Sequence, residues 1–220
     1  IAARQGSPLV IGWGEGAMYL GSDALALAPF TNKLTYLRDG EWACLNREGA
    51  TLRNKRGETI KPTVKETNLS DKQVGKGEFD HFMLKEIYEQ PTVIGESLNA
   101  YFNPVTRNIQ LPECPFDLSA VPSITIIACG TSYFAASVAK YWFESVARIP
   151  VQVEIASEFR YRNSVMPAGG LSIFVSQSGE TVDTLAALRY AKEQGQHVAA
   201  IVNVPESAIA READVVFPTH

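Results

Sequence analysis

The stretch ITIIACGTS at residues 124–132 decides the fold class of this chain. Its first part, ITIIA, is an apolar and β-branched run of the kind found in strands that are buried on both faces. Gly130 and Thr131 then turn the chain into a helix, which the apolar spacing extends from about Ser132 to about Arg148. A buried strand that leads through a short glycine turn into a helix is the first half of a β-α-β unit.

The same alternation of strand and helix continues beyond residue 148. Further buried strands are predicted at residues 151–155, 172–176, 198–202 and 215–217. The helix before the fourth strand has Leu185 and Leu188 on its buried stripe, and a short helix is expected from about 207 to 212. Strands that are apolar on both faces indicate a parallel sheet with both sides covered. We therefore expect an α/β fold, with a five-stranded parallel sheet and helices on both faces.

The first sixty residues have a different, β-rich pattern. The segments 34–37 and 42–45 flank the turn RDGE at 38–41, which predicts a hairpin. A second turn at 47–49 leads to another short strand at 50–52. These strands are too few for a sheet with two well-covered faces, so we interpret them as part of a larger β-rich domain.

A polar segment separates the two regions. Residues 61–80 are rich in charged and small polar side chains, as linkers between domains are. The helix expected after this segment contains Pro91, which should kink or restart it. The predicted organisation is therefore a partial β-rich segment at 1–60, a linker at 61–80 and the α/β domain at 81–220.

Composition argues against several classes of protein. The chain has 220 residues, of which 45% are hydrophobic, and its net charge of −4 argues against a nucleic-acid or membrane-surface partner. No apolar run approaches the length of a transmembrane span. Cys44, Cys114 and Cys129 are too sparse for a disulfide framework or a metal cluster. A reducing, cytoplasmic compartment fits them best, and no metal or cofactor is expected.

Two loops that leave strands carry the residues expected to bind a ligand. Ligands of open parallel sheets bind beyond the carboxyl ends of the strands, where the strand order reverses. There, glycine allows a close approach of the backbone, hydroxyls donate hydrogen bonds, and the first amides of the next helix point outward. The candidates are Cys129, Gly130, Thr131 and Ser132 in the first loop, and Ser176, Gln177, Ser178 and Thr181 in the second.

Neither loop contains Lys or Arg, so neutral dipoles would hold the phosphate. A nucleotide P-loop instead uses a lysine to contact the terminal phosphates, so these loops favour a small sugar phosphate as the ligand. Either loop alone could be an ordinary helix cap, but two in one sheet favour an anion site. Cys129 closes an apolar strand and is interpreted as a small buried residue, not as a nucleophile. Glu180 could belong to the site or only stabilise its helix, and Glu154 and Glu158 could be site or surface residues. Ser207 is expected to cap a helix distant from both loops.

Several long motifs resemble one enzyme family. The segments 126–133, 141–144, 153–162 and 176–184 read IIACGTSY, YWFE, VEIASEFRYR and SQSGETVDT. They resemble the first sugar isomerase (SIS) domain of the glutamine–fructose-6-phosphate aminotransferases. KEIYEQP at 85–91 resembles the segment after that family's interdomain linker, and stretches within residues 6–27 resemble the end of its glutaminase domain.

The resemblance implies an internal part of a longer, homodimeric enzyme. Residues 1–60 would be the end of the glutaminase domain, and 81–220 the first SIS domain, with a flavodoxin-like sheet. The family converts fructose 6-phosphate and glutamine to glucosamine 6-phosphate and glutamate. No catalytic residue is expected in this chain, because the family's nucleophilic Cys and its catalytic Glu, His and Lys lie elsewhere. The family's phosphate contacts match Ser132, Ser176, Gln177, Ser178 and Thr181.

Two other functions are alternatives to this one. One is the SIS-type sugar-phosphate-sensing module of a transcription regulator. Such a regulator needs a basic helix-turn-helix before this domain, whereas β-hairpins are predicted there and the chain is acidic. The other is a flavodoxin-like FMN binder, whose phosphate loop should follow the first strand of the sheet. The loop richest in hydroxyls here follows the third.

Overall fold

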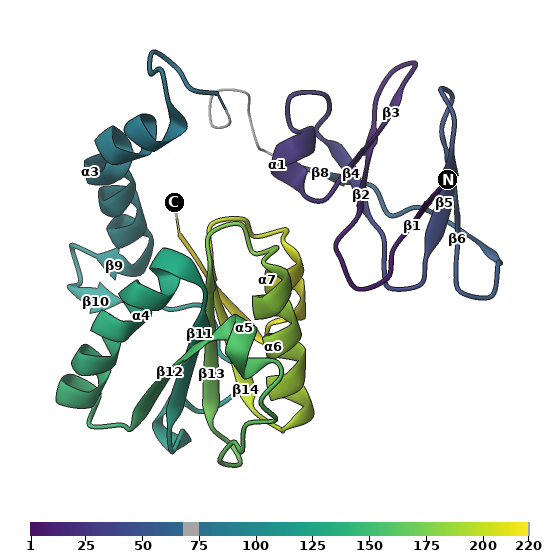
Figure 1. Cartoon of the computed structure of the whole chain (residues 1–220). Helices are drawn as coiled ribbons and strands as arrows, with labels where there is room; N and C mark the ends of the chain where they lie inside the picture. Colours follow the sequence, from purple (N-terminus) through teal and green to yellow (C-terminus); the bar gives the residue numbers. More distant parts are fainter. Residues whose placement is uncertain (68–74, 220) are drawn as a thin grey trace. The chain divides into compact units, whose positions relative to one another are not determined.

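The computed structural model describes residues 1–67 and 75–219 (Figure 1). Within it the chain divides into two compact units, Ile1–Glu89 and Gln90–His220. In the part of the chain that the structure covers, no helix has both the length and the apolar character needed to cross a bilayer.

The second unit is built on a five-stranded sheet in which every pairing is parallel. The strand order is β12-β11-β13-β14-β15, so the chain starts inside the sheet, moves to one edge and then returns across β11 to the other edge. This confirms the predicted sheet. The strands are β11 (Ile124–Ala128), β12 (Val151–Ile155), β13 (Leu171–Ser176), β14 (His197–Val202) and β15 (Val215–Pro218).

Helices cover both faces of this sheet, as predicted (Figure 1). Consecutive residues of β11 show the division: Ile126 belongs to a core cluster with Ala136 of α4, and Ile127 to a second cluster with Leu188 of α6. Because successive side chains of a strand point to opposite faces, α4 lies on one side, and α5, α6 and α7 lie on the other. These helices are α4 (Gly130–Trp142), α5 (Ala156–Phe159), α6 (Val182–Glu193) and α7 (Ala208–Glu212).

Two helix boundaries test the sequence analysis. A π-helical turn, Phe143–Ala147, extends α4 to Arg148, whose φ of 57° ends the helix near the predicted residue. Helix α3 (Phe82–Tyr101) runs through Pro91, so of the two effects predicted for this proline, a kink or a restart, the restart does not occur. Pro91 is exposed, and water can bond the carbonyl that proline leaves without an intrahelical partner.

The segment between α3 and β11 is short of regular structure. It contains the hairpin β9 (Phe102–Asn103) and β10 (Asn108–Ile109) and a 3-10 turn, Leu118–Ala120. The Tyr101 hydroxyl at the end of α3 donates a 2.6 Å hydrogen bond to the carbonyl of Pro218 in β15. Partial burial raises the pKa of this Tyr101 phenol above its ordinary value. The hydrogen bond anchors the end of α3 to the last strand.

The first unit contains two four-stranded antiparallel sheets, of orders β3-β2-β4-β8 and β1-β5-β6-β7, and a short helix, α1 (Ala24–Leu27). A core cluster joins Ile11 of the first sheet to Ala43 and Leu52 of the second. The strands are β1 (Ala2–Ala3), β2 (Val10–Trp13), β3 (Met18–Gly21), β4 (Lys33–Tyr36), β5 (Trp42–Leu45), β6 (Ala50–Arg53), β7 (Thr59–Ile60) and β8 (Lys65–Glu66).

The predicted hairpin across residues 38–41 is wrong. A turn is present there, but β4 pairs with β2 and β8, whereas β5 pairs with β1 and β6. The chain changes sheets because Leu37 is buried in the core and its amide bonds the carbonyl of Leu9 at 3.1 Å. The second turn, at 47–49, does join an antiparallel pair, β5 and β6.

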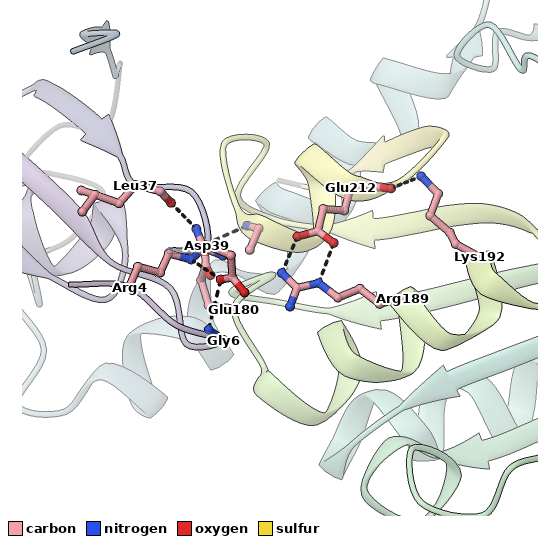
Figure 2. A network of polar contacts seen from close by, with 9 residues as sticks. Arg4, Gly6, Leu37, Asp39, Glu180, Arg189, Lys192 and Glu212 are labelled. Carbon is pink, nitrogen blue, oxygen red and sulfur yellow. Dashed lines mark hydrogen bonds and ion pairs between the residues drawn. The ribbon is translucent and has the colours of Figure 1, made fainter. Parts of the chain in front are cut away.

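Part of the predicted linker is regular structure. Residues 65–66 form β8, which pairs with β4, so this stretch belongs to the first unit. Residues 68–74 of the predicted linker lie outside the described residues. In the same unit, the buried Arg4 donates to the carbonyl of Leu37, and Asp39 accepts from the amide of Gly6 (Figure 2).

Candidate anion-binding site

The two candidate loops leave neighbouring strands at the same edge of the sheet. Ala128, the last residue of β11, is paired with Val175 near the end of β13. From β11 the chain goes to β12 on one side, and the later strands lie on the other, so the strand order reverses between β11 and β13. This is the place where open parallel sheets bind their ligands, and both predicted loops lie there.

The first loop combines an extended residue, a left-handed glycine and a helix start. Cys129 precedes α4, and Gly130 has a φ of 57°, which is easily adopted only by glycine. Thr131 is exposed and Ser132 is half-buried, so both hydroxyls are at the surface of the loop. Cys129 is half-buried against the core cluster of α6, in agreement with its interpretation as a packing residue.

The second loop is organised around the buried hydroxyl of Ser176. This oxygen accepts the amide of Gly179 at 3.1 Å and lies 3.1 Å from the hydroxyl of Thr181. Only one proton is needed between the two hydroxyls, so the pair retains one that it can donate to a ligand. Ser176 is 4% exposed, and its main role here is to close the loop.

Ser178 and Gln177 have different surroundings. The Ser178 hydroxyl accepts the amide of Glu180 at 3.2 Å, and its own proton remains available to a ligand. The side chain of the exposed Gln177 donates from Nε2 to Oδ1 of Asn203 at 3.3 Å. The backbone amide of Asn203 donates to the backbone carbonyl of Gln177 at 3.1 Å. Asn203 is not among the residues predicted from the sequence, although it directly follows β14 of the same sheet.

Gly179 is the tightest point of the site. Its φ is +65°, and a Cβ placed on it would lie 1.9 Å from the hydroxyl oxygen of Ser207. Its carbonyl accepts the amide of Ile209 at 3.0 Å. The expectation that Ser207 lies far from both loops is therefore wrong: Ser207 caps α7 as predicted, but α7 begins directly against this glycine.

The helices that start at the two loops have no side-chain cap. Neither Cys129 before α4 nor Thr181 before α6 makes a capping hydrogen bond. By contrast, Asp23 caps α1 and Ser207 caps α7. Threonine before a helix is ordinarily a cap, but the Thr181 hydroxyl does not cap α6. The first amides of α4 and α6 are left for water or for a ligand.

Both acidic side chains next to the second loop are held by other elements. Oε1 of Glu180 accepts the amide of Ala208 at 2.9 Å, so this carboxylate is directed to the start of α7. Oδ1 of Asp183 accepts a 2.6 Å hydrogen bond from Nη1 of Arg160. The Asp183 carboxylate raises the pKa of the Arg160 guanidinium. Arg160 was not among the candidate residues, because it lies more than twenty positions before α6 in the sequence.

Other polar residues lie in structural contacts. Glu154 pairs with Arg162 at 2.6 Å on the edge strand β12, which favours a surface role for it. Figure 2 shows Arg189 and Lys192 on α6 reaching Glu212 on α7, Arg189 through two bonds of 2.7 and 2.8 Å. These contacts lock α7, and with it Ser207, against α6.

Two of the three histidines, His81 and His197, lie within the described residues. His197 stacks on Phe116 with 4.3 Å between ring centroids, and His81 is exposed. His220 lies outside the described residues. No group of three or more His, Cys, Asp and Glu side chains suited to a metal ion occurs within residues 1–67 and 75–219.

Comparison with known proteins finds similar sequences for this chain. Residues 117–220 match the SIS domain family. A glutamine–fructose-6-phosphate aminotransferase [isomerizing] from Zymomonas mobilis is 54% identical over 220 residues, which is 100% of this chain and 36% of the relative. One from Bradyrhizobium diazoefficiens is 53% identical with the same coverage. The chain thus spans 36% of the length of these relatives.

A solved structure is similar as well. The C-terminal domain of glucosamine-fructose-6-phosphate aminotransferase from Francisella tularensis is 43% identical, with a TM-score of 0.60. The alignment covers 66% of this chain and 42% of that one. A glucosamine-6-phosphate deaminase from Thermotoga maritima, at 23% identity and a TM-score of 0.51, shares the fold.

Proposed function

Since residues 117–220 are a SIS domain and the whole chain is homologous to glutamine–fructose-6-phosphate aminotransferases, we propose that the two loops bind the phosphate of fructose 6-phosphate or glucosamine 6-phosphate. The candidate contacts are those predicted from the sequence. They are the hydroxyls of Thr131, Ser132, Ser176, Ser178 and Thr181, the amide of Gln177, and the backbone of Cys129 and Gly130.

One observation carries this proposal: two uncapped helix N-termini start from neighbouring strands at the point where the strand order reverses. Each presents free amides and the positive end of a helix dipole, and the loops add hydroxyl donors. A phosphate dianion accepts hydrogen bonds only, so it matches these donor groups. The absence of Lys and Arg from both loops leaves the attraction to fixed dipoles.

We further propose that this chain supplies sugar-phosphate binding to a larger enzyme. In that reaction, the amide nitrogen of glutamine is released as ammonia and added to fructose 6-phosphate, which is isomerised to glucosamine 6-phosphate; glutamate is the other product. Residues 1–60 would belong to the glutaminase part, 61–80 to the linker and 81–220 to the first SIS domain. We also propose that the whole enzyme is a homodimer and that it is located in the cytoplasm. The homology favours this over a transcription regulator.

Ser178→Ala should weaken the binding of fructose 6-phosphate. The change removes a hydroxyl donor to a charged group, which is worth about 1–2 kcal/mol, or roughly 5- to 30-fold in Kd. Isothermal titration calorimetry measures this loss. Ser145→Ala is the matched control, because Ser145 is exposed on the π-helical turn and bonds only the carbonyl of Trp142. Equal effects at both serines would contradict a localised site.

Binding should also depend on pH through the ligand. The second ionisation of a phosphate monoester lies near pH ~6, and the helix ends favour the dianion, so affinity should fall as pH drops from about 7.5 to about 5. Fructose 6-sulfate, whose charge does not change in this range, should show no such fall. Affinity should decrease only mildly with salt, because the dipoles act at short range. A steep decrease would show that a cationic side chain contacts the phosphate.

A further inference from the structure

We infer that Arg160 is a positioning residue of this anion site. Its guanidinium neutralises Asp183 in the first turn of α6 and so leaves the start of that helix free for phosphate. This inference rests on the proposed function. It assigns a role to the segment after α5, which belongs to neither loop.

The geometry joins the segments that follow two strands of the sheet, β12 and β13. Helix α5 directly follows β12, and Arg160 is the residue that ends α5. Its guanidinium reaches Oδ1 of Asp183 at 2.6 Å, with side-chain exposures of 26% and 37%. The same guanidinium lies over the ring of Tyr161, 4.7 Å from its centre. Two contacts from different directions therefore hold Arg160 in place.

The charge of Asp183 explains why its pairing with Arg160 should affect phosphate binding. Asp183 is the second residue of α6, where a carboxylate stabilises the helix by occupying the same positive end that a phosphate would use. An unpaired carboxylate there would also repel the dianion. The first turn of α4 contains no acidic residue, so only α6 needs this compensation.

Glu180 is a second acidic residue of this region whose carboxylate is engaged by a neighbouring helix. Its carboxylate accepts the amide of Ala208, at the start of α7. Both acids that border the second loop are thus engaged by partners from neighbouring helices, α5 and α7. A simple surface ion pair between α5 and α6 is the alternative, and such pairs contribute little to stability.

Single and double substitutions separate the two explanations. With inorganic phosphate and fructose 6-phosphate as probes, Arg160→Met should weaken binding by roughly 3- to 10-fold, because it leaves Asp183 unpaired near the dianion. Asp183→Asn should tighten binding by about 3-fold, because it leaves a cation there. The double variant should return to within about 2-fold of the unsubstituted protein, and high salt should reduce every difference.

Arg162→Met is the matched control. It removes the same charge two residues later, but Arg162 pairs with Glu154 on β12 and not with a residue of α6, so affinity should not change. If both single variants weaken binding and the double variant does not recover, the pair is only structural and the inference is wrong. If Arg160→Met binds like the unsubstituted protein, the inference also fails.

Failure of the proposed function has a different signature. In that case the unsubstituted chain binds neither phosphate nor fructose 6-phosphate, and the inference falls with it. Thermal unfolding of each variant shows whether it is folded. Should Arg160→Met not fold, Asp183→Asn still decides: an electrostatic role of the pair predicts tighter binding of the dianion, whereas a purely structural role predicts weaker or unchanged binding.

Discussion

Gly179→Ala is expected to destabilise the second unit by about 3 kcal/mol and to abolish phosphate binding. The φ of +65° costs an L side chain about 1–2 kcal/mol. The new Cβ would also lie 1.9 Å from the hydroxyl oxygen and 2.4 Å from the Cβ of Ser207, so α7 must move, at a further 1–3 kcal/mol or so. Hydrogen exchange of the β13 and α7 amides measures the loss of stability.

Gly130→Ala is the matched control for this substitution. Gly130 also has a positive φ, of 57°, but no atom lies within 4 Å of its Cβ position. It should therefore show only the backbone cost of about 1–2 kcal/mol. Gly179→Ala combined with Ser207→Gly should recover the part that is due to the overlap. Equal losses at Gly179 and Gly130 would contradict the close approach of α7 to the second loop.

Thr181→Asp should eliminate binding of fructose 6-phosphate while keeping or raising stability. Thr181 precedes α6 and makes no capping bond, whereas aspartate at this position can cap the helix and complements its dipole. Its charge would lie where the phosphate is proposed to bind. Two unit charges 4 Å apart repel by about 4 kcal/mol at an effective dielectric constant of about 20, so affinity should fall by more than roughly 100-fold.

Thr181→Asn isolates the charge in this experiment. Asparagine has nearly the same shape as aspartate, can also cap the helix and equally loses the hydroxyl pair with Ser176. Its binding should therefore be reduced only modestly, by roughly 10-fold or less. Calorimetry gives the affinities, and thermal unfolding gives the stability. Equal losses of affinity for both variants would show that no anion occupies the start of α6.

The sequence by itself determined the α/β class, the five strands and the two loops. The predicted strands at 124–128 and 172–176 are rich in apolar and β-branched residues, and the loops after them combine glycine with hydroxyls. These are local signals, since each depends on residues within one element and its flanking turn. The same applies to the turn at 47–49, where two adjacent strands pair.

Contacts between residues distant in the sequence were decided only by the tertiary structure. The sequence pattern predicts strands at residues 34–37 and 42–45, but not that Leu37 is buried and directs the two strands to different sheets. Likewise, Ser207 lies against Gly179 and Arg160 meets Asp183 because α5, α6 and α7 pack on one face of the sheet. Strand order and helix packing arise from burial of the whole core, so no local pattern contains them. The residues proposed to bind phosphate could therefore be predicted from the sequence, whereas those that hold and balance the proposed site could be identified only in the fold.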